Sequence, residues 1–120
     1  MGARILALGA FLCAAAVAAG AFGAHGLRAR FDARQLELWE TAARYLMYGG
    51  LGVLALTLAE LVRQRPVGLA PALLAAGAAV FAGTVFALAL GGPRWLGAIT
   101  PLGGAAMIAA FLLFVWRALR

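Results

Sequence analysis

The 120-residue sequence contains no serine and no lysine, and it has one cysteine and one histidine. Without serine, and with a single histidine, the chain cannot form a nucleophilic triad. The single cysteine, Cys13, excludes an internal disulfide and any metal site built from several cysteines. Phosphate-binding loops, nucleophile elbows, metal-ligand pairs and dinucleotide fingerprints are also missing. We therefore expect a protein that is not an enzyme, with no cofactor and no bound metal.

Charged residues are scarce as well: they make up 12% of the chain, whereas 66% of the residues are hydrophobic. A soluble domain has about 25% charged residues, so these few polar groups cannot cover a water-soluble fold. So apolar a chain does not remain disordered either, and transmembrane helices are the leading interpretation. The formal charge of +6 comes from dispersed arginines, not from the clustered basic face that binds nucleic acid. We expect no nucleic-acid partner.

Four long apolar runs predict four membrane spans, since about 20 apolar residues cross the hydrocarbon core as a helix. The runs are rich in Ala and Leu and apolar on all sides, which favours helices over the alternating polarity of a β-barrel. The second run reaches span length only if Arg44 or Glu60 snorkels from a helix end. We expect an all-α integral membrane four-helix bundle, one domain over residues 1–120, with spans at approximately 5–25, 42–62, 67–90 and 95–117.

Two of the three connections are short and one is long. Residues 63–66 contain a proline, and residues 91–94 read Gly-Gly-Pro-Arg, so both predict tight links between antiparallel neighbours. The first connection, residues 27–41, carries much of the charge, and Asp32 followed by Gln35 predicts a capped helix start. We expect a short amphipathic helix that runs into the second span, either in the membrane interface or as a solvated hairpin arm.

Polar and aromatic side chains gather around this first connection. Glu40, Arg44 and Tyr48 repeat at intervals of four and therefore share one stripe of a helix. His25 ends the first span and would face this stripe if the first two spans pack side by side. The set is either a polar clamp between two helices or a functional site, because ionisable groups at this depth are functional candidates. The candidate polar cluster comprises His25, Trp39, Glu40, Thr41, Arg44, Tyr45 and Tyr48.

Small residues and one proline are expected to set how the spans pack. In lipid, helices associate through close backbone approach at small residues and through a few polar contacts. Thr100-Pro101 predicts a kink in the fourth span, with the threonine hydroxyl satisfying a carbonyl that the proline frees. The kink serves either packing or a hinge. Beside Thr100 and Pro101, the candidate packing positions are Gly20, Gly23, Gly83, Gly103 and Gly104.

Several motifs resemble one known family. Residues 21–27, Ala-Phe-Gly-Ala-His-Gly-Leu, are similar to the N-terminal signature of the YgdD-like family of small bacterial inner-membrane proteins, which have a small transmembrane counterpart in animals. Members usually carry a histidine after the equivalent of Tyr48, where this chain has Gly49, so a two-histidine ligand site with His25 is lost here. The resemblance implies four helices in the inner membrane and no defined activity. It continues at residues 39–42, 45–48, 80–90 and 100–104.

Orientation follows from counting arginines. Four antiparallel spans place both termini on one side, which carries five arginines against four or five on the other. The α-amino group adds one positive charge to the first side. Because positive charge favours the cytoplasmic side, we expect a multi-pass protein with both termini in the cytoplasm.

Two classes of function fit these observations. The leading hypothesis is a non-enzymatic membrane protein that acts through helix contacts, as an accessory or stabilising subunit of a larger membrane complex or as a homo-oligomer. Its partners would be the lipid bilayer and other membrane subunits or itself. The alternative is a small channel or transporter for an ion, a proton or a lipid-like molecule. Transport pathways usually need ionisable groups at mid-depth, and three of the four spans carry none.

Overall fold

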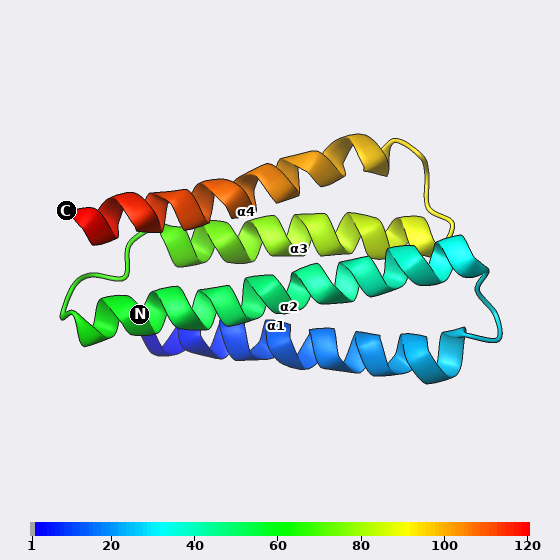
Figure 1. Ribbon diagram of the computed structural model, residues 1–120, viewed down its shortest axis with the longest axis horizontal. Helices are drawn as coiled ribbons and strands as arrows, with labels where there is room; N and C mark the ends of the chain where they lie inside the picture. Colours follow the sequence, from blue (N-terminus) through cyan, green and yellow to red (C-terminus); the bar gives the residue numbers. More distant parts are fainter. Residues whose placement is uncertain (1) are drawn as a thin grey trace.

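The computed structural model describes residues 2–120, and within that range it consists of helices joined by turns and short loops (Figure 1). Four helices are long and apolar enough to cross a membrane. This confirms the predicted all-α membrane architecture. The elements are α1 (Gly2–Phe22), the short π-helix η1 (Gly23–Leu27), α2 (Ala33–Val62), α3 (Ala70–Ala89) and α4 (Leu96–Leu119).

The four long helices form an open row in chain order (Figure 1). α1 packs against α2, α2 against α3, and α3 against α4, while α1 has few contacts with α3 and none of any extent with α4. The inner helices α2 and α3 are 44% buried over their most apolar stretch, compared with 17% for α1 and α4. Most of the surface of the two outer helices is therefore available to lipid or to another protein.

The charged segment before the second span is part of α2 and not a separate helix. Asp32 accepts from the backbone N–H of Gln35 at 2.8 Å, and the Gln35 side chain accepts from the N–H of Asp32 at 3.0 Å. This is the predicted capping box. The 30 residues of α2 extend over about 45 Å, more than the hydrocarbon core of about 30 Å. The amphipathic segment thus continues the span as an arm along the same axis.

Close backbone approach fixes the outer helices to the inner pair. A Cβ placed on Gly50 of α2 would lie 2.9 Å from the carbonyl oxygen of Gly9 in α1. A Cβ on Gly103 of α4 would lie 2.5 Å from the backbone N of Phe81 and 2.8 Å from the carbonyl oxygen of Gly77, both in α3. Any larger residue at Gly103 must push α3 and α4 apart.

The remaining predicted packing glycines divide into two kinds. Gly23 lies against the Trp39 ring, where a Cβ would come within 2.6 Å, and Gly104 lies in ordinary contact with the Phe81 ring. In contrast, a Cβ on Gly20 or Gly83 would meet nothing within 4 Å. These two glycines therefore do not contribute to packing within the chain.

Candidate functional site

Trp39 is the centre of the contacts at the end of the molecule that carries the first connection. Its indole Nε1–H donates to the carbonyl oxygen of Ala19 in α1 at 2.7 Å. Three phenylalanine rings pack edge-on against the indole, with centroid distances of 4.5 to 6.4 Å: Phe22, Phe31 and Phe86. Trp39 therefore holds α1, the loop before α2, and α3 together, which is a structural role.

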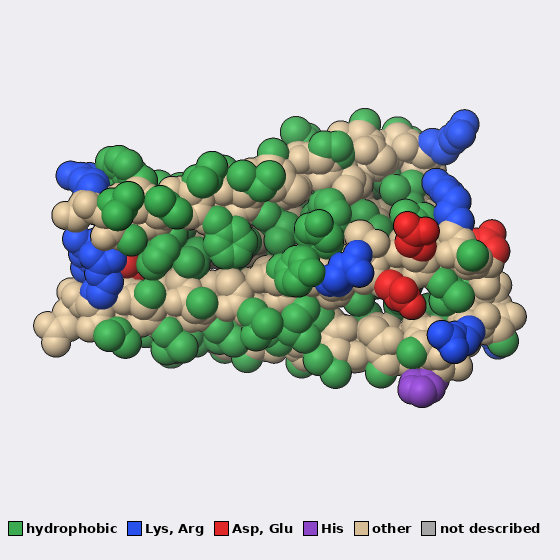
Figure 2. Space-filling view, viewed as in Figure 1, with side chains coloured by type: hydrophobic (Ala, Val, Ile, Leu, Met, Phe, Trp, Pro, Cys, Tyr) green, Lys and Arg blue, Asp and Glu red, His purple; other side chains and the backbone are tan. Residues whose placement is uncertain are grey.

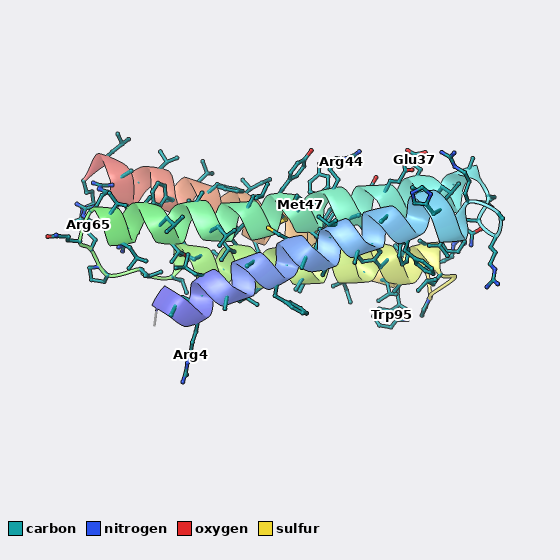
Figure 3. The ribbon with its side chains drawn as sticks, turned by 90° about the horizontal axis from the view of Figure 1, so that it is seen from below. Arg4, Glu37, Arg44, Met47, Arg65 and Trp95 are labelled. Carbon is teal, nitrogen blue, oxygen red and sulfur yellow. The ribbon has the colours of Figure 1, made fainter. Side chains whose placement is uncertain are left out.

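The stripe of Glu40, Arg44 and Tyr48 is exposed and does not face His25. Arg44 projects upward from α2 in Figure 3, out of the row of helices and not toward α1. Its Nη2 donates weakly to Thr41 Oγ1, 3.4 Å away on the same helix. His25 is itself exposed, and within residues 2–120 no hydrogen bond or ion pair joins it to the stripe. The structure thus does not bring these members of the cluster together, and their function stays a prediction.

Tyr45 and Tyr48 belong to a different feature, a groove between α2 and α4. The ring of Tyr45 lies 5.1 Å from that of Tyr48 and 4.6 Å from that of Phe81, measured between centroids. Phe81 belongs to α3 and forms the floor, while Met107 and Phe111 line the α4 side. The groove has a volume of about 740 Å³. Its lining is almost entirely apolar, so it can take up hydrocarbon but offers little to an ion.

The main polar contact among the spans was not predicted from the sequence. Glu60, expected to snorkel from a helix end, is buried, with 1% of its side chain exposed. Its Oε2 accepts from Arg117 Nη2 at 2.7 Å, and the same nitrogen donates to the carbonyl oxygen of Pro66 at 2.9 Å. Glu60 Oε1 and the hydroxyl of Thr57, both buried, have no hydrogen-bond partner among the described residues. The interaction ties α2 to α4 and to the loop before α3.

The alternating direction of the spans gives a sequence signal for this contact. Glu60 lies two residues before the end of α2, and Arg117 lies two residues before the end of α4. The second and fourth spans run in the same direction, so their last turns reach the same membrane depth. Opposite charges at equal depth on two nearby spans are the sequence signal for such a pair.

Arginines surround this pair at the end of the molecule where the C-terminus lies (Figure 2). Arg65 Nη1 donates to the carbonyl oxygen of Arg117 at 2.9 Å, and Arg63 Nη2 donates to that of Ala118 at 3.4 Å. Figure 3 shows Arg4 and Arg65 at the same end, far from Glu37 and Trp95. This end therefore combines many cations with a single buried carboxylate.

Thr100 lies at a contact between α4 and α3, and its hydroxyl does not bond the carbonyl that Pro101 frees. Pro101 lies inside α4 and frees the carbonyl of Gly97, four residues earlier. The Thr100 hydroxyl instead bonds the carbonyl of Leu96 at 3.1 Å and contacts the hydroxyl of Thr84 at 2.6 Å. The threonine pair thus acts as a polar contact between two spans, which favours packing over a hinge.

Comparison with known proteins identifies the family. Residues 19–104 match the family model described as "Protein of unknown function (DUF423)". The chain is 43% identical over 108 residues to the UPF0382 membrane protein SSP2132 of Staphylococcus saprophyticus, covering 90% of each chain. It is 42% identical over 113 residues to SERP0230 of Staphylococcus epidermidis, covering 94% of this chain and 93% of the relative.

A relative in a second genus extends this result. The UPF0382 membrane protein YwdK of Bacillus subtilis is 39% identical over 115 residues, covering 94% of each chain. No solved structure matches the chain. The relatives are bacterial membrane proteins by name, in agreement with the four apolar helices. The chain therefore belongs to the DUF423 family, a family of unknown function whose members include the UPF0382 membrane proteins.

Proposed function

We propose that the protein is non-enzymatic and acts through helix contacts, as an accessory or stabilising subunit of a larger membrane complex or as a homo-oligomer. The observation that carries this proposal is a face of small residues on α3 that packing within the chain leaves unused. Gly83 lies on this face, and a Cβ there would meet nothing within 4 Å.

The small face continues along α3 beyond Gly83. Ala72, Ala76 and Ala79 are exposed, and their spacing of three and four residues places them with Gly83 on one helical stripe. Small residues let a second helix approach closely in lipid, where apolar area alone gives no driving force. Beside the stripe, α3 and α4 enclose a hollow of about 270 Å³. The face is thus suited to receive a helix from another subunit.

The row of helices also argues against a pore within one chain. Because α1 and α4 make no extensive contact, the four helices surround no central axis. The charged side chains lie mainly at the two ends, as Figure 2 shows for the visible face. For the alternative function, only the apolar groove between α2 and α4 offers support, and it favours a lipid-like molecule over an ion. A liposome flux that is lower for His25→Ala than for the wild type would support the channel or transporter hypothesis.

The test is purification from the native membrane in polymer discs, which keep neighbouring lipids and subunits. We expect the wild type to run well above its chain mass of 12.3 kDa. Gly83→Leu should shift it to the monomer, because the side chain would block the small face. Gly97→Leu is the matched control: Gly97 is also an exposed helical glycine without near neighbours, but on α4. A wild type that is monomeric in every disc and mild detergent would refute the proposal.

We further propose that the protein lies in the inner membrane with both termini in the cytoplasm. The two termini lie at the same end of the molecule (Figure 1), and the arginines there favour the cytoplasmic side. A cysteine introduced at residue 120, in a Cys13→Ala background, should not react with an impermeant reagent applied to intact cells. Labelling from outside would reverse this orientation.

A further inference from the structure

Three guanidinium groups line one pocket at the end of the molecule that carries the C-terminus. The pocket, of about 360 Å³, lies between the last turns of α4 and the loop before α3, and we call it the arginine pocket. Its lining residues are Arg65, Pro66, Trp116, Arg117 and Arg120. Among the side chains of the described residues, Glu60 is the one carboxylate paired to this set, so these four charged side chains carry a net charge of +2.

Most of the donors in the arginine pocket remain available. Each guanidinium carries five N–H donors. Arg117 uses Nη2 for Glu60 and Pro66, and Arg65 uses Nη1 for a backbone carbonyl. The Arg120 guanidinium stacks over the Trp116 ring at 4.6 Å, which orients it without occupying a donor. Several N–H groups from three residues can therefore meet one anion that has several acceptor oxygens.

The depth of the arginine pocket matches the headgroup layer. The 24 residues of α4 span about 36 Å, somewhat more than the hydrocarbon core of about 30 Å. The last turn therefore emerges among the headgroups, where tryptophans such as Trp116 are typically found. Arginine binds phosphate oxygens in bidentate fashion. We propose that the arginine pocket binds the phosphate-bearing headgroup of an anionic phospholipid.

The surface next to the pocket favours a lipid over a free phosphate ion. Ala109, Leu112, Trp116 and Arg120 are exposed and are spaced by three, four and four residues, so they lie along one stripe of α4. From Arg120 to Ala109 the stripe runs about 16 Å, close to half of the hydrocarbon core. An acyl chain attached to a headgroup in the pocket can follow this apolar stripe, whereas inorganic phosphate gains nothing from it.

The test measures lipid binding to the delipidated, purified protein by native mass spectrometry. The probes are phosphatidylglycerol and phosphatidylcholine with identical acyl chains, with inorganic phosphate as a competitor. One arginine near an anionic headgroup contributes about 1 kcal/mol, or about a fivefold change in affinity. We therefore expect Arg65→Gln and Arg120→Gln each to weaken phosphatidylglycerol binding about fivefold, and the double variant about 25-fold.

Matched controls distinguish lipid binding in the arginine pocket from general electrostatic attraction between anionic lipids and a basic surface. Arg63→Gln removes the same charge at the same end but outside the pocket lining, and it should change the affinity less than twofold. Equal effects of Arg63→Gln and Arg120→Gln would overturn the proposal, as would equal binding of the two lipids. Full displacement of phosphatidylglycerol by millimolar inorganic phosphate would also overturn it, in favour of a small-anion site.

Arg120→Gln keeps the test decisive if Arg65→Gln unfolds the protein. Arg120 is exposed and makes no side-chain hydrogen bond in the part of the chain that the structure describes, so its substitution should leave the helical ellipticity unchanged. The lipid measurement uses purified protein and does not require a partner on the Gly83 face. A failure of lipid selectivity therefore leaves the proposed helix contact standing, and the reverse also holds.

Discussion

The buried pair of Glu60 and Arg117 allows a prediction with a definite asymmetry. Arg117→Gln removes the cation and leaves a carboxylate that is 1% exposed, with one oxygen that already lacks a partner. Removing one partner of a buried pair costs about 3–5 kcal/mol, and the lower end applies near a helix end. Glu60→Gln removes the buried charge and keeps an amide oxygen for Arg117, so it should cost only about 1–1.5 kcal/mol.

The double variant supplies the decisive comparison. With both residues changed to glutamine, no buried charge remains, and the cost should be about 2 kcal/mol, below that of Arg117→Gln alone. The cycle should therefore give a coupling energy of about 2 kcal/mol. The assay is reversible unfolding in mixed micelles, followed by helical ellipticity, with Arg4→Gln as an exposed control expected within about 0.5 kcal/mol of wild type.

Additive effects of the two single variants would refute this reasoning. So would an Arg117→Gln variant that is no less stable than Glu60→Gln. Either result would mean that water reaches Glu60, and that the pair contributes no more than an exposed salt bridge, about 0–1 kcal/mol.

Three further predictions concern packing and capping. Gly103→Ala should lower the free energy of unfolding by about 1–3 kcal/mol, because its Cβ would meet the backbone of α3. Gly83→Ala should instead raise it by up to about 1 kcal/mol, because its Cβ meets nothing within 4 Å. Equal effects of the two substitutions would contradict the helix spacing. Trp39→Phe should cost about 1 kcal/mol by removing the bond to Ala19, and faster hydrogen exchange at the end of α1 would report it. Asp32→Ala should cost about 1 kcal/mol and fray the first turn of α2, which amide exchange of residues 33–36 would detect; unchanged exchange would exclude a stabilising cap.

Local features of the fold could be predicted from the sequence. The four spans follow from the length of the apolar runs, and the start of α2 follows from Asp32 and Gln35, whose capping needs only residues three apart. The third helix begins at Ala70, three residues later than predicted, and the preceding loop includes Gly68 with φ of 74°. Composition alone did not reveal that the chain leaves the helical region there.

Contacts between distant residues could not be predicted in the same way. Glu60 and Arg117 are 57 residues apart, and their pairing depends on which spans are neighbours. The sequence also does not distinguish Gly103, pressed against α3, from Gly83, which faces outward, because both occur among small residues. His25 was expected to face the stripe of Glu40 and Arg44, yet the rotation of α2 turns Arg44 away from α1.

We propose that the small face of α3 contacts another membrane protein or a second copy of the chain. The most direct test places a photoreactive amino acid at residue 83, and in a parallel strain at residue 97, and illuminates intact cells. We predict a discrete cross-linked species above the 12.3 kDa chain from residue 83 and only the uncross-linked chain from residue 97. Cross-linking at residue 83 that does not exceed that at residue 97 would contradict the account.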